Sequence, residues 1–321
     1  MTGTPPTAAR DLAIETRGMQ KIYYSGFLRQ PSTGLEGLDL EVLRGEVFGF
    51  IGPNGAGKTT TIKCLVGLQY PTAGQAFLMG TPIDHPEARR KLGFLPERPY
   101  FYQHLTAREF LNFYGQLFDI PTAVRRNRIG ELLTRVDLER VADVPLRQYS
   151  KGMLQRAGIA QALINDPELI ILDEPMSGLD PLGRRLIRDL ILHERSRGRT
   201  VFFSSHVLSD VQSICNRVGL VAGGRLRAIG SIDELLSEQV ENVDCTVRVP
   251  GDVTLTGQPV ATQGDERILR LPPDQLDTLL DQVRQCGGQV IQVLPNRKTL
   301  EDLLLTELGR NHPSDPPEAS S

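Results

Sequence analysis

Long hydrophobic runs are missing from this sequence of 321 residues. A helix needs about 20 consecutive apolar residues to cross a bilayer, whereas the most apolar stretches here, at 47–51 and 169–172, have the length of single strands. The first ten residues also lack the apolar core of a secretory signal. These absences predict a cytoplasmic chain that reaches the inner face of the cell membrane only through a partner.

Cysteine is sparse and excess positive charge is absent. The four cysteines are scattered without a paired metal-binding spacing, so we expect small buried side chains in a reducing compartment. The formal net charge is −3, whereas nucleic-acid-binding proteins usually carry a basic face. No nucleic-acid partner is therefore expected. With 40% hydrophobic and 23% charged residues, the composition indicates an ordinary globular protein.

What is present divides into a large domain, a small domain and two tails. Residues 1–11 and 311–321 lack periodicity, which predicts disorder. Residues 12–240 form the large domain, which begins with β-rich segments and contains a helical subdomain at about 98–165. Residues 241–310 are predicted to form a small accessory domain of α+β type.

The spacing of apolar residues predicts the strands and helices of the small domain. Alternating apolar residues predict a strand at 243–249, and a leucine-rich helix is expected between Pro273 and Gly287. A second strand is predicted at 289–294, followed by a helix capped by Thr299. None of these segments carries a recognisable chemical motif.

Two local patterns mark the helical subdomain. Thr106 and Glu109 have the spacing of a capping box, which predicts a helix N-terminus. A short run of arginines follows at Arg125, Arg126 and Arg128. We expect this run to be a solvated helix face without a functional role.

The first chemical motif follows the apolar strand at 47–51. It matches the phosphate-binding pattern G-x-x-x-x-G-K-[ST] and leads into a predicted helix at 60–68. Glycines let the loop point its N–H groups inward, and the helix N-terminus adds a positive dipole end for phosphate. Lys58 is predicted to reach the β- and γ-phosphates of ATP, and Thr59 to bind Mg²⁺. The predicted nucleotide-binding residues of this segment are Gly52, Pro53, Asn54, Gly55, Ala56, Gly57, Lys58, Thr59 and Thr60.

Two adjacent carboxylates end the second apolar strand, at 169–172. Asp173 can hold Mg²⁺ directly or through water, and Glu174 can polarise an attacking water as a general base. A strand that ends in Asp-Glu is weak evidence alone. After the upstream phosphate loop, it predicts nucleotide hydrolysis.

A third motif, Tyr-Ser-Lys-Gly-Met-Leu-Gln-Arg at 149–156, lies just before this strand. Ser150 is a good N-cap residue, so its hydroxyl and the following amides would form an anion site at a helix N-terminus. The motif is similar to the LSGGQ signature of ABC-type ATPases. With the loop around Lys58 and the carboxylates, the chain resembles that family over residues 13–240.

The resemblance implies a composite site that two subunits share. In the family, the signature binds the γ-phosphate of ATP that a second subunit holds, which assigns Ser150 and Gly152 to a partner's nucleotide. The segment Ser-Gly-Leu-Asp that ends at Asp180 is similar to the family's D-loop, which contacts the partner. A homodimer is therefore the simplest expected assembly, and a heterodimer is the other one.

Two further positions follow from the resemblance. His206 comes directly after a predicted strand and resembles the switch histidine that stands near the γ-phosphate. Tyr23 resembles the aromatic residue that stacks on adenine. Tyr24 is a close rival, and ordinary core packing is an alternative for either ring.

The chain also departs from the family pattern. Lys151 and Met153 replace the first glycine and the glutamine of the signature, which indicates a subfamily character. Glu97 stands where the family usually has the glutamine that links the catalytic core to the helical subdomain. Glutamate can still bind Mg²⁺, but its charge would repel the γ-phosphate unless the metal offsets it. We expect Glu97 to keep the coupling role.

These motifs lead to one expected fold and function. The fold class is α/β: a P-loop core of ABC type with an antiparallel β subdomain and a helical subdomain, plus the small α+β domain. The resemblance implies a subunit that binds and hydrolyses ATP with Mg²⁺ and powers export through a separate membrane-spanning permease. A soluble ABC-type ATPase that acts on ribosomes or DNA is the alternative. The cargo stays open, because in the family the permease selects it.

Overall fold

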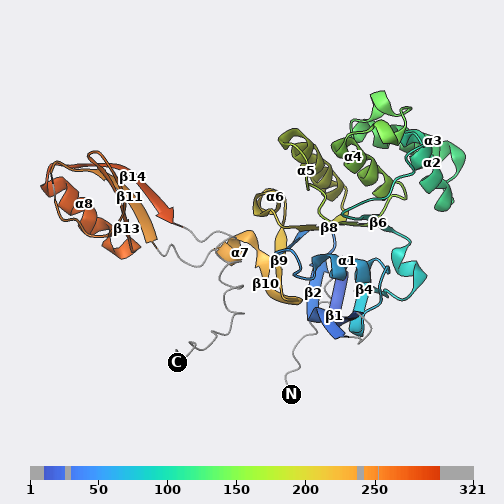
Figure 1. The fold of residues 1–321 in the computed structure, drawn as a ribbon, viewed down its shortest axis with the longest axis horizontal. Coiled ribbons are helices and arrows are strands. Elements are labelled where there is room, and N and C mark those ends of the chain that lie inside the picture. Colours follow the sequence, from blue (N-terminus) through green and yellow to red (C-terminus); the bar gives the residue numbers. More distant parts are fainter. Residues whose placement is uncertain (1–10, 26–29, 237–241, 252, 297–321) are drawn as a thin grey trace, which may run out of the picture. The chain divides into compact units, whose positions relative to one another are not determined.

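The computed structural model describes residues 11–25, 30–236, 242–251 and 253–296. The chain divides into two compact units between Ile232 and Asp233. The first unit holds all three chemical motifs, and Figure 1 labels the elements of both.

Several expectations concern residues outside this description. Except for Asp11, the predicted disordered tails at 1–11 and 311–321 fall there, as does the helix predicted after Thr299. The expected domain boundary at 240/241 also lies among residues that are not described.

An antiparallel sheet opens the first unit. Its strands run in the order β2-β1-β4-β5. In β2, buried and exposed positions alternate toward the strand's end, because one face of the sheet covers the core and the other does not. The strands are β1 (Leu12–Ser25), β2 (Gln30–Leu43), β4 (Ala73–Leu78) and β5 (Thr81–Pro82).

The central sheet of the first unit has the strand order β10-β9-β3-β8-β7-β6. All its neighbours pair in parallel except β10 with β9. Strands β3 and β7 are apolar throughout because both faces of a parallel sheet are covered. The strands are β3 (Val47–Ile51), β6 (Leu92–Leu95), β7 (Leu169–Leu172), β8 (Thr200–Ser205), β9 (Arg217–Ala222) and β10 (Arg225–Ser231).

Helices cover both faces of the central sheet. Figure 1 shows α1 and the antiparallel sheet on one side of it and α4 and α5 on the other. Among the described residues, no helix is both long and apolar enough to span a membrane. The α-helices of this unit are α1 (Lys58–Leu65), α2 (Ala107–Leu117), α3 (Thr122–Arg135), α4 (Lys151–Ala162), α5 (Pro181–Ser196) and α6 (Leu208–Gln212), with α7 (Ile232–Leu236) across the division. The short 3₁₀ helices are η1 (Pro86–Arg89), η2 (Glu139–Val141) and η3 (Leu146–Gln148).

The helical subdomain confirms one local prediction and corrects another. Thr106 and Glu109 form the expected capping box at the start of α2. The arginine run was expected to be a solvated helix face, which holds for Arg126 but is wrong for Arg125. Arg125 is buried, and its guanidinium donates to Asn112 Oδ1 on α2 and to the Ile120 carbonyl. Arg128 donates to the Ile164 carbonyl at 2.9 Å. Arg125 and Arg128 thus tie α3 to neighbouring segments.

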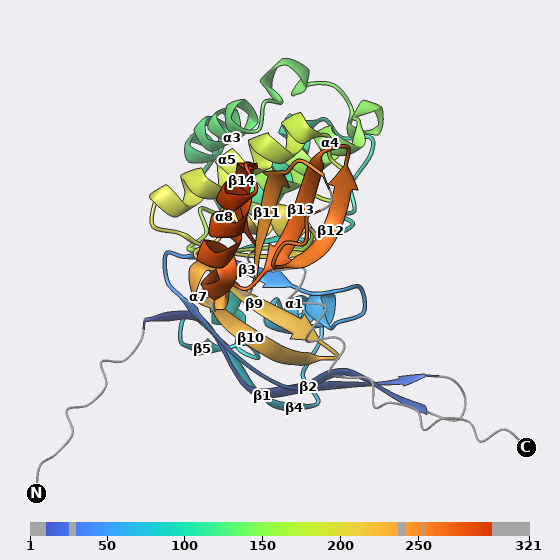
Figure 2. The same cartoon turned by 90° about the vertical axis from the view of Figure 1, so that its left-hand side faces the viewer.

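The second unit is a four-stranded antiparallel sheet with one helix. Its strand order is β12-β13-β11-β14, and Figure 2 shows α8 lying along the sheet. Its core forms where Cys245 and Val247 of β11 meet Leu279 and Val283 of α8. The elements are β11 (Asn242–Arg248), β12 (Gln258–Gln263), β13 (Glu266–Leu271), η4 (Pro273–Gln275), α8 (Leu276–Gln285) and β14 (Gln289–Asn296). The pair β12–β13 was not anticipated.

The main core of the first unit is expected to be sensitive to loss of Phe202. This ring is fully buried on β8, with ring centroids 5.8 Å from Phe48 and 5.4 Å from Phe50. Phe202→Ala should lower the free energy of unfolding by about 3–5 kcal/mol, because it removes apolar contacts and leaves a cavity. Urea unfolding followed by circular dichroism measures the change.

The matched control is Tyr100→Ala, since the Tyr100 side chain is 82% exposed. This change should alter the free energy of unfolding by no more than about 0.5 kcal/mol. Equal losses in the two variants would contradict the assignment of Phe202 to the core.

Candidate functional site

The phosphate loop joins β3 to α1, which begins at Lys58. The Lys58 Nζ donates to the Gly52 carbonyl at 2.7 Å and to the Pro53 carbonyl at 3.2 Å. The loop borders a cavity of about 460 Å³, which is within the usual range for small-molecule sites. This cavity is lined by Gly34, Pro53, Asn54, Gly55, Gly57, Lys58, Thr59, Thr60, Glu97, Glu174, Ser177 and His206.

Three glycine backbones meet behind the loop. Gly57 has a φ of +106° just before α1, and a Cβ there would lie 2.8 Å from the Gly34 carbonyl oxygen. A Cβ on Gly224 would lie 3.0 Å from the same oxygen. The motif predicted Gly57. Gly34 and Gly224 were missed because their role depends on contacts distant in the sequence, and no local pattern marks them.

Asp173 is buried directly after β7, with a side chain only 2% exposed. Ser204 Oγ donates to its Oδ1 at 2.6 Å. Burial raises the pKa of Asp173, and the hydrogen bonds from Ser204 and Thr59 oppose that rise. Thr59 on α1 and Asp173 after β7, two of the three residues expected to hold Mg²⁺, are therefore brought together.

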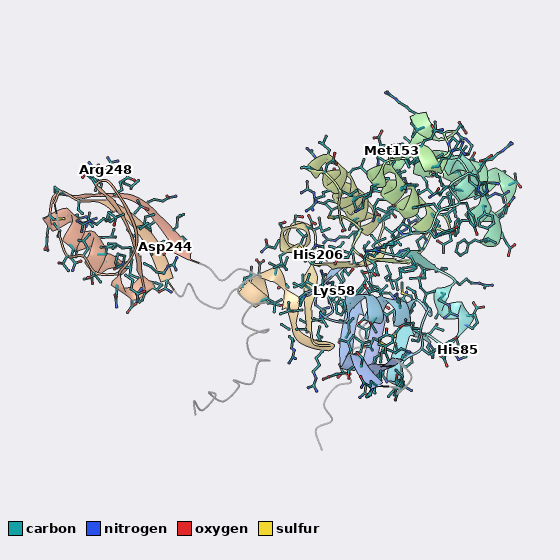
Figure 3. The ribbon with its side chains drawn as sticks, viewed as in Figure 1. Lys58, His85, Met153, His206, Asp244 and Arg248 are labelled. Atoms are coloured by element: carbon teal, nitrogen blue, oxygen red, sulfur yellow. The ribbon has the colours of Figure 1, made fainter. Side chains whose placement is uncertain are left out.

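Glu174 is the point where the predicted catalytic residues converge. Its Oε1 lies 3.6 Å from Lys58 Nζ, and its Oε2 lies 2.8 Å from His206 Nδ1. Lys58 and His206 lie close to each other in Figure 3. Glu174 has a φ of +50°, a strained conformation for a residue with a side chain, and its N–H donates to Ser204 Oγ at 2.9 Å. Ser204, which was missed from the sequence, thus bonds to both neighbouring acids.

Tyr23 lies beside the loop without lining the cavity. Its hydroxyl donates to Gln69 Oε1 at 2.7 Å and lies 3.2 Å from Thr60 Oγ1. Its ring packs against Gly34, where a Cβ would lie 2.6 Å from the ring. The rival residue, Tyr24, has a side chain that is 64% exposed. The contact with Thr60 links Tyr23 to the phosphate-loop motif, and no such contact is seen for Tyr24 among the described residues.

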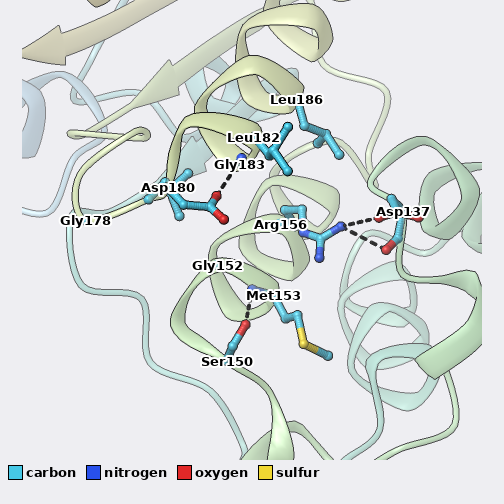
Figure 4. Close-up of a pocket in the computed structure, with 11 residues that line it drawn as sticks. Asp137, Ser150, Gly152, Met153, Arg156, Gly178, Asp180, Leu182, Gly183 and Leu186 are labelled. Carbon is cyan, nitrogen blue, oxygen red and sulfur yellow. Dashed lines mark hydrogen bonds and ion pairs between the residues drawn. The ribbon is translucent and has the colours of Figure 1, made fainter.

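The signature residues border a different cavity, of about 270 Å³ (Figure 4). Ser150 caps α4, and its Oγ accepts from the Met153 N–H at 3.3 Å, as the sequence predicted. Asp180 caps α5 by accepting from the Gly183 N–H at 2.7 Å. Gly152 and Asp180 both line this second cavity, whereas neither lines the phosphate-loop cavity.

The unusual signature residues take distinct places. Lys151 is exposed, and its Nζ occupies the space that a side chain at Gly178 would need. Met153 lines the second cavity. Gln155, which was not singled out from the sequence, is buried and donates to the Pro175 carbonyl at 3.0 Å. It thereby ties the signature helix to the segment after Glu174.

Glu97 lies between β6 and the helical subdomain and lines the phosphate-loop cavity. Its side chain is 47% exposed, and its Oε1 lies 3.9 Å from Arg98 Nε. Glu97 and Glu174 thus line the same cavity. In the described part of the chain, no cluster of three or more His, Cys, Asp or Glu could hold a metal alone.

Together, the parallel sheet, the phosphate loop and the separate signature helix define an ABC-type nucleotide hydrolase. A family model described as ABC transporter matches residues 35–177. The chain is 43% identical over 312 residues to an uncharacterized ABC transporter ATP-binding protein of Nostoc sp., which covers 94% of this chain and 91% of that protein. It is 34% identical over 306 residues to the Nod factor export ATP-binding protein I of Cupriavidus metallidurans. That match covers 92% of this chain and 97% of that protein.

The solved structures agree with these relatives. A dimeric ATP-binding cassette in a post-hydrolysis state bound to ADP and Pi matches with a TM-score of 0.63 and 26% identity, over 68% of this chain and 98% of that one. The chain belongs to the family of ABC transporter ATP-binding proteins. It is an ATP-hydrolysing transporter subunit, and the alternative of a soluble ATPase for ribosomes or DNA is not supported. The expected fold class is confirmed.

Replacing the buried Asp173 is expected to stabilise the protein. Because burial raises its pKa, the ionised carboxylate favours the unfolded chain, and stability falls as the pH rises through the folded-state pKa. Asp173→Asn should therefore raise the free energy of unfolding at neutral pH, by on the order of 1 kcal/mol per pKa unit. The gain should shrink as the pH falls below that pKa. Urea unfolding over a pH series measures it.

Asp143→Asn is the control, because the pKa of Asp143 is shifted in the opposite direction. Asp143 is exposed, and its hydrogen bond with Arg108 lowers its pKa. This variant should show no gain in stability at neutral pH. If Asp173→Asn is also no more stable than the unmodified protein, the raised pKa of Asp173 is wrong.

Proposed function

We propose that two copies of the chain hold two ATP molecules between them and drive export through a separate membrane-spanning permease. The division of the site supports this assembly. Lys58, Glu174 and His206 line one cavity, whereas Ser150 and Gly152 line another. A nucleotide on the phosphate loop would then need a signature from a second copy, or from a related ATPase in a heterodimer.

Hydrolysis is assigned to the residues around Glu174. Lys58 holds the β- and γ-phosphates, and Glu174 accepts a proton from the water that attacks the γ-phosphorus. The bond from the γ-phosphorus to the bridging oxygen breaks, and ADP leaves. His206, whose Nδ1 lies 2.8 Å from Glu174 Oε2, orients this carboxylate and approaches the γ-phosphate.

Mg²⁺ is assigned to Thr59 and Asp173, with Glu97 on the same cavity. Hard oxygen ligands suit Mg²⁺, which binds through few protein groups together with phosphates and water. Asp173 is buried and joined to Thr59 by a hydrogen bond, so the donor set fits this ion. When bound, Mg²⁺ would neutralise part of the phosphate charge and so offset the repulsion between Glu97 and the γ-phosphate.

The remaining assignments concern nucleotide and partner contacts. Tyr23 is assigned to adenine because it alone of the two candidate rings contacts Thr60 of the loop. Ser150, Gly152 and Asp180 are assigned to the partner's side of the composite site. Export is supported by the Nod factor export protein of Cupriavidus metallidurans and a daunorubicin resistance protein of Streptomyces coeruleorubidus, both similar to this chain over more than 90% of its length. In this proposal, binding to the permease holds the subunit at the cytoplasmic face of the membrane.

Glu174→Gln should separate hydrolysis from binding. The amide keeps the shape of the side chain but cannot accept the proton, so kcat should fall by about 100-fold or more. The dissociation constant for ATP should stay within about threefold. Steady-state ATPase rates and equilibrium nucleotide binding measure the two effects.

The control is Glu168→Gln, because Glu168 pairs with Lys91 and Arg44 away from both cavities. It should hydrolyse ATP like the unmodified chain. An unchanged kcat in Glu174→Gln would remove Glu174 from the role of general base.

Mixing two inactive variants should test the composite site. Lys58→Ala removes the phosphate contact, and Ser150→Arg fills the signature position. Each variant alone lacks every complete site, whereas a mixed dimer has one phosphate loop and one signature that are both intact. An equal mixture should recover ATPase activity, up to about a quarter of the unmodified rate, since half of the dimers are mixed and each has one complete site.

Mixing Lys58→Ala with a Lys58→Ala, Ser150→Arg double variant is the control. Its mixed dimers contain no intact phosphate loop and should stay inactive. Recovery in the control, or none in the test mixture, would argue against sites shared between two copies.

A further inference from the structure

Arg184, on the first turns of α5, connects two segments that belong to different cavities. Its Nε donates to the Leu179 carbonyl at 3.3 Å, and its Nη1 lies 3.5 Å from Asp210 Oδ2 on α6. Leu179 belongs to the D-loop segment 177–180, and Asp210 lies four residues after His206. The guanidinium therefore spans from the partner-facing loop to the helix that follows the switch histidine.

The segment 177–180 borders both halves of the nucleotide site. Ser177 lines the phosphate-loop cavity, whereas Gly178, Leu179 and Asp180 line the signature cavity. If a nucleotide phosphate entered the cavity lined by Ser150 and Gly152 and shifted this segment, the Leu179 carbonyl would move with it. Arg184 is bonded to that same atom.

Asp210, the other partner of Arg184, lies beside Glu174 and His206. Arg184, Asp210, Glu174 and His206 line one small cavity of about 40 Å³. The Asp210 side chain is only 12% exposed. Its position in the first turn of α6, a helix of five residues, ties it closely to the backbone that carries His206. Moving Asp210 would therefore move His206 relative to Glu174.

The neighbouring arginines do not make this connection. Arg185 and Arg188 lie on the same helix, and their ion pairs go to Asp189, also on α5. Their pairs stay within one helix, whereas Arg184 bridges separate segments. The charge of α5 alone does not explain the contacts of Arg184.

We propose that Arg184, through Asp210, is a positioning residue that transmits occupancy of the signature cavity to the His206–Glu174 pair. The proposal rests on the composite site proposed above and adds the connection between its two halves. Arg184 touches neither reacting group. Its role is to hold the segment 177–180 and α6 as one body, so that hydrolysis on one copy responds to the nucleotide of the other.

The test is a double-mutant cycle on the full chain. Arg184→Gln, Asp210→Asn and their combination are compared with the unmodified protein for kcat, KM, ATP dissociation constant and the Hill coefficient of ATPase activity. Each single change should lower kcat by about tenfold and bring the Hill coefficient toward one, with KM and ATP affinity within about threefold. The double variant should be no worse than the more damaging single variant, because both break the same connection.

Two controls make the result specific. Arg185→Gln removes the same charge from α5 and should leave kcat and the Hill coefficient unchanged. Arg184→Lys keeps the charge but cannot reach both partners with its single ammonium, so it should fall between the unmodified chain and Arg184→Gln. If Arg184→Gln does not fold, as judged by thermal unfolding, Arg184→Lys and Asp210→Asn carry the test.

Several outcomes would overturn the proposal. These are additive losses in the double variant, an equal effect of Arg185→Gln, or an unchanged kcat in both single variants. Failure of the composite site itself is distinct: the mixture of Lys58→Ala and Ser150→Arg chains would then recover no activity. A mixture that recovers activity, together with Arg184 and Asp210 variants that behave like the unmodified protein, would reject only the connection.

Discussion

Parallel pairing of β3, β8 and β7 is the constraint on which the site depends. Ile51 at the end of β3 pairs with Ser205, and Leu172 at the end of β7 pairs with Phe203. Three strands thus end at one edge of the sheet, where the phosphate loop, the two acids and His206 emerge together. The covered apolar strands fix this register, since slippage would place polar residues in the core.

The residues now assigned to the candidate site were recognisable in the sequence because their signals are local. A phosphate loop needs glycines and a lysine within a few positions, and the acids follow directly on an apolar run. Ser150 and Thr106 were likewise visible as caps, since capping depends on near neighbours. The fold class followed from the same order of motifs.

What the sequence did not reveal depends on long-range packing. Arg125 appears in a run of basic residues, yet it is buried because carbonyl and amide oxygens on neighbouring segments accept its N–H groups. Ser204 and Gln155 have ordinary neighbours in the sequence, and their roles arise from partners 20 or more residues away. The β12–β13 hairpin was missed because polar and charged residues interrupt its apolar alternation.

The contact among Gly34, Gly57 and Gly224 has a consequence for how such a domain can be altered. It joins the antiparallel sheet, the phosphate loop and the β9–β10 turn, because a Cβ on Gly57 or on Gly224 would lie no more than 3.0 Å from the Gly34 carbonyl oxygen. Main-chain contacts cannot be restored by a compensating change of side chain. A chimaera that exchanges the antiparallel sheet between relatives must therefore keep glycine at positions 57 and 224, however freely the surrounding surface is recombined.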